Sequence, residues 1–385
     1  MAMKIKVGQT VRGKDFFPRE KEILRLWKKI ENGNNILISA PRRVGKTSLM
    51  RFLQDNPKEN FLIIYLITES VSNENEYYKR LYKNLLEEDV VNWFTRIGAV
   101  SKNVLNKISE IGKSLKIEGN RNLDYYSEFI ILIKSLKLES NRLIIMIDEF
   151  PQTLENIINE QGNNAAYHFL QTNRELRQSP EISEKVQFIY TGSIGLENIV
   201  SRINSVNLIN DLDVFHLQPL KETEARDLIN ELVLNLKFTL ESVIIDKILS
   251  EIKWHIPYYI QIVIQEIDNI YDEKDLTIID ESIVDLAFKQ LLEQRIYFEH
   301  WYKRLEKAYK SNEYKFARDL LNSISTNDNI SVNEVLNLAT GLNIQDKYKE
   351  IVNALIHDGY INVDSNNYRF NSPLLKLWWE KNVAG

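Results

Sequence analysis

Five short apolar runs, separated by stretches with helical periodicity, constrain the fold of this chain more than any other feature. Each run is continuous rather than alternating, which is typical of strands covered by helices on both faces. We therefore predict an α/β fold with a doubly wound parallel sheet. The runs are "NILIS" (35–39), "NFLIIYLI" (60–67), "RLIIMID" (142–148), "VQFIYTG" (186–192) and "DVFHLQ" (213–218).

The periodicity changes twice after the last apolar run, and these changes set the expected domain boundaries. Residues 1–218 are predicted to form the sheet-containing core, with a helical insertion at about 72–140. Its stretch 72–127 is a candidate partner surface. Residues 219–295 carry the apolar spacing of amphipathic helices and are predicted to form a helical subdomain. Residues 296–385 read as three helices followed by a hairpin, the plan of a winged helix. Trp301, Tyr302, Trp378 and Trp379 are predicted to be core or interface anchors of this last part, with base stacking as the alternative.

The composition excludes several classes of site and location. The 385 residues include no cysteine, which excludes disulfides, thiolate metal sites and thiol nucleophiles. The longest apolar runs cover less than half of the ~20 residues needed to cross a bilayer, and no signal peptide is recognisable at the N-terminus. We therefore expect a cytoplasmic protein with no membrane contact. The net charge of −5 argues against non-specific nucleic-acid binding by the chain as a whole.

The stretch "APRRVGKTSLM" follows the first apolar run and leads into a helical pattern, so it is a candidate phosphate-binding loop. Gly45, Lys46 and Thr47 supply the end of the G-x-x-x-x-G-K-[ST] pattern, whereas Ala40 stands where the first glycine is usual. An alanine fits there unless the position needs a positive φ. The alternative is a basic surface turn after an edge strand. The candidate nucleotide-binding residues are Ala40, Pro41, Arg42, Arg43, Val44, Gly45, Lys46, Thr47 and Ser48.

An acidic pair, Asp148 and Glu149, ends the third apolar run. Ligands of open α/β sheets bind at the carboxyl ends of the strands, which is where this pair is expected. With Thr47, Asp148 is the candidate Mg²⁺ ligand, acting through water, and Glu149 is the candidate catalytic group that orients or deprotonates the attacking water. Lys46 is the second catalytic candidate, because it reaches the outer phosphates. The alternative is a solvated acidic pair that caps a buried strand.

Two further catalytic candidates lie near the fourth run. Ser193, or Thr191, follows "FIY" at a strand end where a polar residue can sense the γ-phosphate. Arg202, in "SRINSVN", is a candidate arginine finger acting on a neighbouring subunit, with an ordinary surface arginine as the alternative.

These motifs, in this order, resemble the archaeal-type predicted ATPases of the AAA+/STAND P-loop superfamily, a group also widespread in bacteria. "FFPRE" with Arg19 looks like the element before the phosphate loop, and "HIPYYIQ" with Pro257 looks like the lid element that approaches the nucleotide base. The resemblance implies a P-loop NTPase core with strand order 5-1-4-3-2, a helical lid at 219–295 and a C-terminal winged helix. It also implies ATP or ADP with Mg²⁺ as ligands, and it adds Arg19 and Pro257 to the nucleotide-binding residues.

Several functions remain open at this point. The first is an ATP-binding, and by expectation ATP-hydrolysing, switch whose winged helix contacts a protein or DNA partner. The second is a DNA-binding regulator or initiator-like ATPase, although residues 296–385 hold equal numbers of basic and acidic side chains. The third is a scaffold that keeps nucleotide bound without hydrolysing it. No particular protein partner, pathway or oligomeric state can be predicted from these residues.

Overall fold

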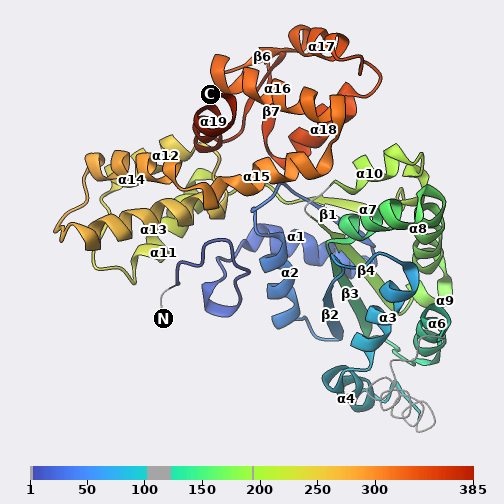
Figure 1. Cartoon of the computed structure of the whole chain (residues 1–385). Helices are drawn as coiled ribbons and strands as arrows, with labels where there is room; N and C mark the ends of the chain where they lie inside the picture. The colour runs from blue at the N-terminus through green and yellow to red at the C-terminus, as the bar shows by residue number, and fades with distance from the viewer. Residues whose placement is uncertain (1–2, 102–122, 193–194) are drawn as a thin grey trace. The chain divides into compact units, whose positions relative to one another are not determined.

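The computed structural model of the chain describes residues 3–101, 123–192 and 195–385 (Figure 1). These residues divide into two compact units. The first, called the sheet unit, consists of Pro18–Ser39 and Lys46–Leu217. The second, called the helical unit, consists of Met1–Phe17, Ala40–Gly45 and Gln218–Gly385. The short 40–45 loop therefore groups with the helical unit, although both of its neighbours in the sequence belong to the sheet unit.

The sheet unit contains one parallel sheet built from the five apolar runs. Its strands are β1 (Ile36–Ser39), β2 (Phe61–Ile67), β3 (Arg142–Asp148), β4 (Val186–Thr191) and β5 (Asp213–His216). Their order is β2-β3-β4-β1-β5, which confirms the expected order 5-1-4-3-2 read from the other edge. The central strands β3 and β4 are buried along almost their whole length, because helices cover both faces.

The helices of the sheet unit form a layer on each side of the sheet. In Figure 1, α1 and α2 lie on one face, and α3, α7 and α8 lie on the other. The second face holds an aromatic core in which Phe150 packs against Tyr77, Phe169 and Tyr190. The helices are α1 (Glu20–Glu31), α2 (Lys46–Asp55), α3 (Glu74–Leu85), α4 (Glu88–Arg96), α6 (Tyr125–Ser135), α7 (Phe150–Gln161), α8 (Asn163–Gln178), α9 (Pro180–Ser183) and α10 (Leu196–Arg202).

Helices α3, α4 and α6 occupy the insertion between β2 and β3. Polar side chains cap two of them: Asn73 accepts a hydrogen bond from the Glu76 N–H, and Asp124 accepts one from the Ser127 N–H. The helical character predicted for the start of the insertion is therefore present. Residues 102–122 of the predicted insertion lie outside the described residues.

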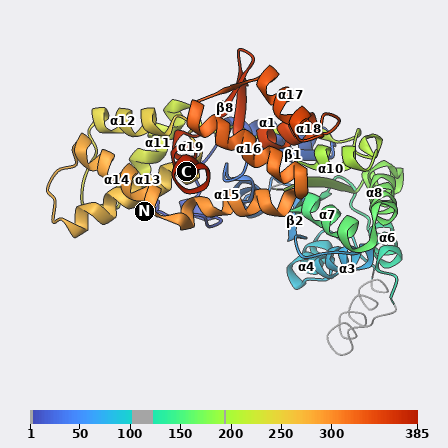
Figure 2. The ribbon, with the colours of Figure 1, turned by 45° about the horizontal axis from the view of Figure 1, so that its top comes forward.

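Beyond Gln218, the helical unit begins with a run of helices. After α11 (Glu222–Val233), α12 (Ser242–Ile252), α13 (Pro257–Glu273) and α14 (Glu281–Glu293) come α15 (Arg295–Ala308) and α16 (Ser311–Asn327). The C-terminal part continues with β6 (Ile330–Ser331), α17 (Val332–Gly341), α18 (Tyr348–Asp358), β7 (Ile361–Asp364), β8 (Asn367–Phe370) and α19 (Pro373–Trp379). Four helices, α15 to α18, precede the β7–β8 hairpin instead of the three predicted, because the first predicted helix is divided into α15 and α16 (Figure 2).

Two details of this part follow from local chemistry. Ser365 and Asn366, between β7 and β8, both have positive φ, as a two-residue hairpin turn of type I′ requires. Of the four predicted aromatic residues, Trp301, Trp378 and Trp379 are buried in the core, whereas Tyr302 is only half-buried. Strand β6 adds a third strand by pairing with β8, which was not expected.

Among the described residues, no helix combines the length and the hydrophobicity needed to span a bilayer.

Candidate functional site

Residues 40–45 form the loop of the candidate phosphate-binding motif. It connects the end of β1 to the first residue of α2, Lys46. Gly45 has a φ of 104°, which favours glycine, and Arg43 also adopts a left-handed conformation with a φ of 64°. Ala40 is buried and is not among the residues with positive φ, so the alanine that replaces the usual first glycine causes no backbone strain there.

The loop makes close contacts within the helical unit. Arg43 donates a hydrogen bond of 3.1 Å from Nη1 to the Gly8 carbonyl, and its guanidinium lies 4.8 Å from the centre of the Tyr258 ring. Pro41 lies so close to Gly359 that a Cβ placed on that glycine would be 2.9 Å from the Pro41 Cβ. The pKa of Arg42 is lowered, first by burial and then by the neighbouring Arg304. The loop is therefore packed against side chains from its own unit.

The residues that follow the loop meet the acidic end of β3. Thr47 donates a hydrogen bond of 2.8 Å from Oγ1 to Oδ2 of Asp148. Lys46 is only 8% exposed and Asp148 only 3% exposed. Burial raises the pKa of the Asp148 carboxyl, and the hydrogen bonds from Tyr65 and Thr47 and the charge of Lys46 oppose that rise. The motif at Lys46 and Thr47 and the acidic motif at Asp148 are about a hundred residues apart in the sequence. They thus come together at the carboxyl edge of the sheet.

Tyr65 is a member of this site that sequence reasoning missed. Its hydroxyl donates a hydrogen bond of 2.7 Å to the same Asp148 Oδ2 that accepts from Thr47. Burial and the Asp148 charge raise the pKa of Tyr65, so the hydroxyl keeps its proton and remains a donor. Arg51 of α2 stacks on the Tyr65 ring at 3.6 Å from its centre. The only available signal was one polar aromatic residue in the aliphatic run "FLIIYLI".

Glu149 occupies a strained position beside the end of β4. It has a φ of 60° and precedes α7, whose second residue is Pro151. A Cβ placed on Gly192 would lie 2.5 Å from Pro151 Cδ and 3.4 Å from Glu149 Oε2. Gly192 therefore permits the end of β4 to approach the turn that holds Glu149. A left-handed glutamate costs roughly 1 kcal/mol, and such strain is concentrated at functional sites.

The other predicted residues occupy different environments. The Thr191 hydroxyl donates to the Ile38 carbonyl and so joins β4 to β1, whereas Ser193 lies outside the described residues. Arg202, at the end of α10, is paired with Glu155 of α7. Arg19 is buried beside Glu22 at the start of α1, and Pro257 is the first residue of α13 in the helical unit. Val44 is buried and Ser48 lies in the first turn of α2.

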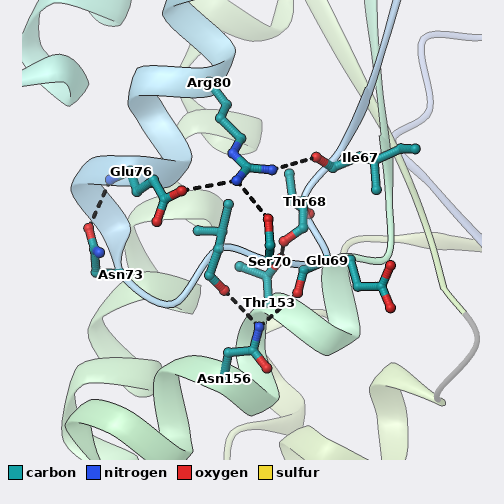
Figure 3. A network of polar contacts seen from close by, with 10 residues as sticks. Ile67, Thr68, Glu69, Ser70, Asn73, Glu76, Arg80, Thr153 and Asn156 are labelled. Carbon is teal, nitrogen blue, oxygen red and sulfur yellow. Dashed lines mark hydrogen bonds and ion pairs between the residues drawn. The ribbon is translucent and has the colours of Figure 1, made fainter. Parts of the chain in front are cut away.

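A polar network fixes the loop that leads from β2 to α3 (Figure 3). The Thr68 N–H donates to the Asp148 carbonyl, and the Thr153 hydroxyl donates to the Thr68 carbonyl at 2.7 Å. Asn156 donates to the carbonyls of Glu69 and Val71, and Arg80 donates to the Ile67 carbonyl. These contacts link the backbone of Asp148 to helices α3 and α7. They were not predictable from the sequence, since most of them join residues far apart in the chain.

Comparisons with known proteins bear on the fold. No family model matches the chain, and no curated protein matches it. A Walker-type ATPase of Pyrococcus abyssi has a similar structure, with a TM-score of 0.64 and 15% identity, covering 97% of this chain and 99% of that chain. The ORC2 protein of Aeropyrum pernix, solved as ADPNP–ADP complexes, is similar with a TM-score of 0.58 and 12% identity, covering 94% of this chain and 93% of that chain. The chain therefore has the fold of the AAA+ P-loop ATPases.

Proposed function

We propose that the protein binds ATP with Mg²⁺ at the carboxyl edge of the sheet and hydrolyses it to ADP and phosphate. The observation that carries this proposal is the hydrogen bond between Thr47 and Asp148, with buried Lys46 beside them. A hydroxyl and a carboxylate are the oxygen ligands that suit Mg²⁺, which keeps several waters and binds through one or two protein groups. The arrangement also matches the fold, in which this edge is the expected ligand position.

Each residue then has a distinct role. Lys46 neutralises charge on the outer phosphates, and the N–H groups at the start of α2 donate to phosphate oxygens. Thr47 and Asp148 would hold the metal ion, which stabilises negative charge on the phosphates when it is bound. Glu149, beside Gly192 at the end of β4, orients the water that attacks the terminal phosphate. Tyr65 holds the Asp148 carboxylate in one orientation.

The experiment that tests this role separates binding from turnover. Glu149→Gln keeps the shape of the side chain but removes its basicity, so it should bind ATP at least as well as wild type and lose about 100-fold or more of its turnover. Glu160→Gln, an exposed glutamate near the end of the helix that Glu149 precedes, is the matched control. Phosphate release and ATP affinity are measured for all three proteins. Undiminished turnover by the Glu149→Gln variant would show that another group activates the water.

We further propose that nucleotide binding acts as a switch through the 40–45 loop. The support is that Arg43 contacts Tyr258, next to Pro257 at the start of α13. A ligand that draws this loop toward its phosphates changes those contacts, and hence the position of α13, because only differential contacts can shift a conformational equilibrium. Hydrogen exchange in α13 should respond to ATP in wild type and in the control Arg96→Ala, but not in Arg43→Ala. An unchanged response in Arg43→Ala would refute this coupling.

We propose that residues 296–385, the predicted winged helix, bind a protein partner in preference to DNA. The candidate recognition helix α18 is preceded by Lys347, but that lysine is paired with Glu313 at 2.8 Å. The β7 residue Val363 is 54% exposed, as suits a protein contact. A fluorescence-anisotropy titration with duplex DNA at two salt concentrations distinguishes the classes. Salt-dependent binding of the duplex would show that DNA is a ligand and would contradict this preference.

A further inference from the structure

A cavity of about 450 Å³ lies in the sheet unit between the start of α3, the start of α6 and helices α7 and α8. Its lining includes Glu74, Tyr78, Asp124, Tyr126 and Thr172. None of these belongs to the candidate nucleotide site. The proposed function gives this cavity no role.

Two buried polar atoms at this cavity have no hydrogen-bond partner among the described residues. The Tyr78 side chain is 0% exposed and its hydroxyl is unpaired, and Oε1 of Glu74 is likewise buried and unpaired. Buried polar atoms are hydrogen-bonded in the great majority of cases, and leaving one unpaired is costly. Both atoms belong to residues that line the same cavity, which indicates that a polar ligand entering it could complete their hydrogen bonds.

The charges around the cavity indicate a positive ligand. Its lining contains two carboxylates and no lysine or arginine. Asp124 is held ionised, because the Ser127 hydroxyl and N–H hydrogen-bond to it and lower its pKa. Burial raises the pKa of Glu74, and the neighbouring Thr172 side chain opposes that rise. A cation would compensate both carboxylates.

The aromatic side chains narrow the class of cation. Tyr78 and Tyr126 meet edge to face, with ring centres 4.8 Å apart. Aromatic faces beside carboxylates favour organic ammonium and guanidinium groups, which combine ion pairing with cation–π attraction. The described residues contain no group of three or more histidine, aspartate or glutamate side chains arranged to hold a metal ion. An organic cation therefore fits these walls better than an inorganic one.

We propose that this cavity binds an organic cation bearing an ammonium or guanidinium group, which donates hydrogen bonds to Glu74 Oε1 and to the Tyr78 hydroxyl oxygen. Both groups carry several N–H donors, enough to reach two acceptors at once. Tyr126 supplies an aromatic wall, and Asp124 adds a second negative charge at the rim. The residues of this site come from the insertion between β2 and β3 and from helices α7 and α8, which pack around the sheet.

Calorimetric titration of the full chain tests the proposal. Agmatine, which carries both cationic groups, is the probe, and pentanamide is its uncharged counterpart. Agmatine should bind at millimolar concentration or below and raise the melting temperature, whereas pentanamide should do neither. No binding of agmatine, or equal binding of both compounds, would overturn the proposal.

Three variants assign the binding to this cavity. Glu74→Gln should weaken agmatine about 10-fold or more, since it removes the ion pair. Tyr78→Phe should weaken it by about 3-fold or more, yet leave the ligand-free protein as stable as wild type or more so, because it removes an unpaired buried hydroxyl. Glu87→Gln, an exposed glutamate just before α4, is the control. If Glu74→Gln, with its melting temperature confirming a folded protein, binds agmatine as wild type does, the assignment is wrong.

A second experiment distinguishes two sources of the cation, a free amine and an arginine side chain of a partner protein. The peptide Gly-Arg-Gly with blocked ends carries the same guanidinium on a protein side chain. Tighter binding of this peptide than of agmatine would assign the site to an arginine of a partner protein, and the reverse would assign it to a free amine. Either result supports the site when Glu74→Gln weakens the binding. ATP turnover is measured separately, so failure of the proposed ATPase would leave this test intact.

Discussion

The hydroxyl of Tyr65 donates a 2.7 Å hydrogen bond to Asp148, and it shares Oδ2 of that carboxylate with Thr47. Tyr65 stands on β2, Thr47 on α2 and Asp148 on β3, so three elements converge on one oxygen atom. This oxygen is buried, and a buried carboxylate needs such donors to remain charged. The Tyr65 contact therefore helps to keep Asp148 charged, as the proposed Mg²⁺ site requires.

Replacing Tyr65 with phenylalanine tests that relationship. The variant leaves a buried carboxylate with one donor fewer, so the free energy of unfolding should fall by about 1 to 3 kcal/mol. The pKa of Asp148 should rise further, and more Mg²⁺ should be needed for half-maximal ATP turnover. Urea denaturation and a Mg²⁺ titration measure the two effects. Tyr78→Phe removes a buried tyrosine hydroxyl with no partner among the described residues, and it should cost no stability. Equal stabilities of the two variants would contradict this account.

The close packing at Gly359 makes a second prediction. Gly359 has a φ of 90°, and a Cβ there would lie 2.5 Å from the Trp254 ring and 2.9 Å from Pro41. Gly359→Ala should therefore destabilise the fold by about 2 to 4 kcal/mol, combining backbone strain with a steric clash.

Gly33→Ala is the matched control for that prediction. Gly33 has a φ of 83° but open space around its Cα, so only the strain of about 1 kcal/mol remains. Chemical denaturation compares the two variants. If Gly359→Ala were no worse than Gly33→Ala, the contact with Trp254 and Pro41 would not constrain the position.

A third prediction concerns pH. Burial, followed by the charges of Arg43, Arg42 and Arg304, lowers the pKa of His300 from 6.5 to about 3. Between these values the unfolded chain binds more protons than the folded one. The contribution of neutral His300 to stability is therefore complete above pH 6.5 and is lost progressively as the pH falls toward 3.

The variant His300→Phe keeps a ring against Tyr258 and Trp301 but does not titrate. From neutral pH down to about pH 5, it should lose less stability than wild type, by about 1 to 2 kcal/mol. His168→Phe, which removes an exposed histidine of α8, is the matched control. Parallel curves for wild type and His300→Phe, measured by urea denaturation, would rule out titration of His300 as the cause.

The parts of the fold that were predictable rest on local patterns. The run "RLIIMID" predicted a buried strand ending in Asp148, since continuous apolar residues need cover on both faces, and β3 spans Arg142–Asp148. The loop and helix at Lys46 followed from the small residues and the apolar spacing after β1. The strand order came from resemblance to a known family, because periodicity does not say which strands are neighbours.

The unpredicted features depend on contacts between distant residues. The hydrogen bond from Tyr65 to Asp148 joins positions 83 residues apart, and nothing in a strand pattern shows which polar group a buried hydroxyl meets. The same holds for Asn156, which donates to the Val71 carbonyl, and for Ile330 of β6, which pairs with Tyr368 of β8. The unpaired hydroxyl of Tyr78 is likewise visible only in three dimensions.

The most direct test of the nucleotide assignment is a calorimetric titration of ATP and Mg²⁺ into wild type, Lys46→Ala and the control Lys83→Ala, which changes an exposed lysine of α3. Wild type and the control should bind alike. Lys46→Ala should lose at least about 10-fold in affinity, because a buried cation no longer meets the phosphates. Absence of binding by wild type, or equal affinity for wild type and the folded Lys46→Ala variant, would contradict the assignment.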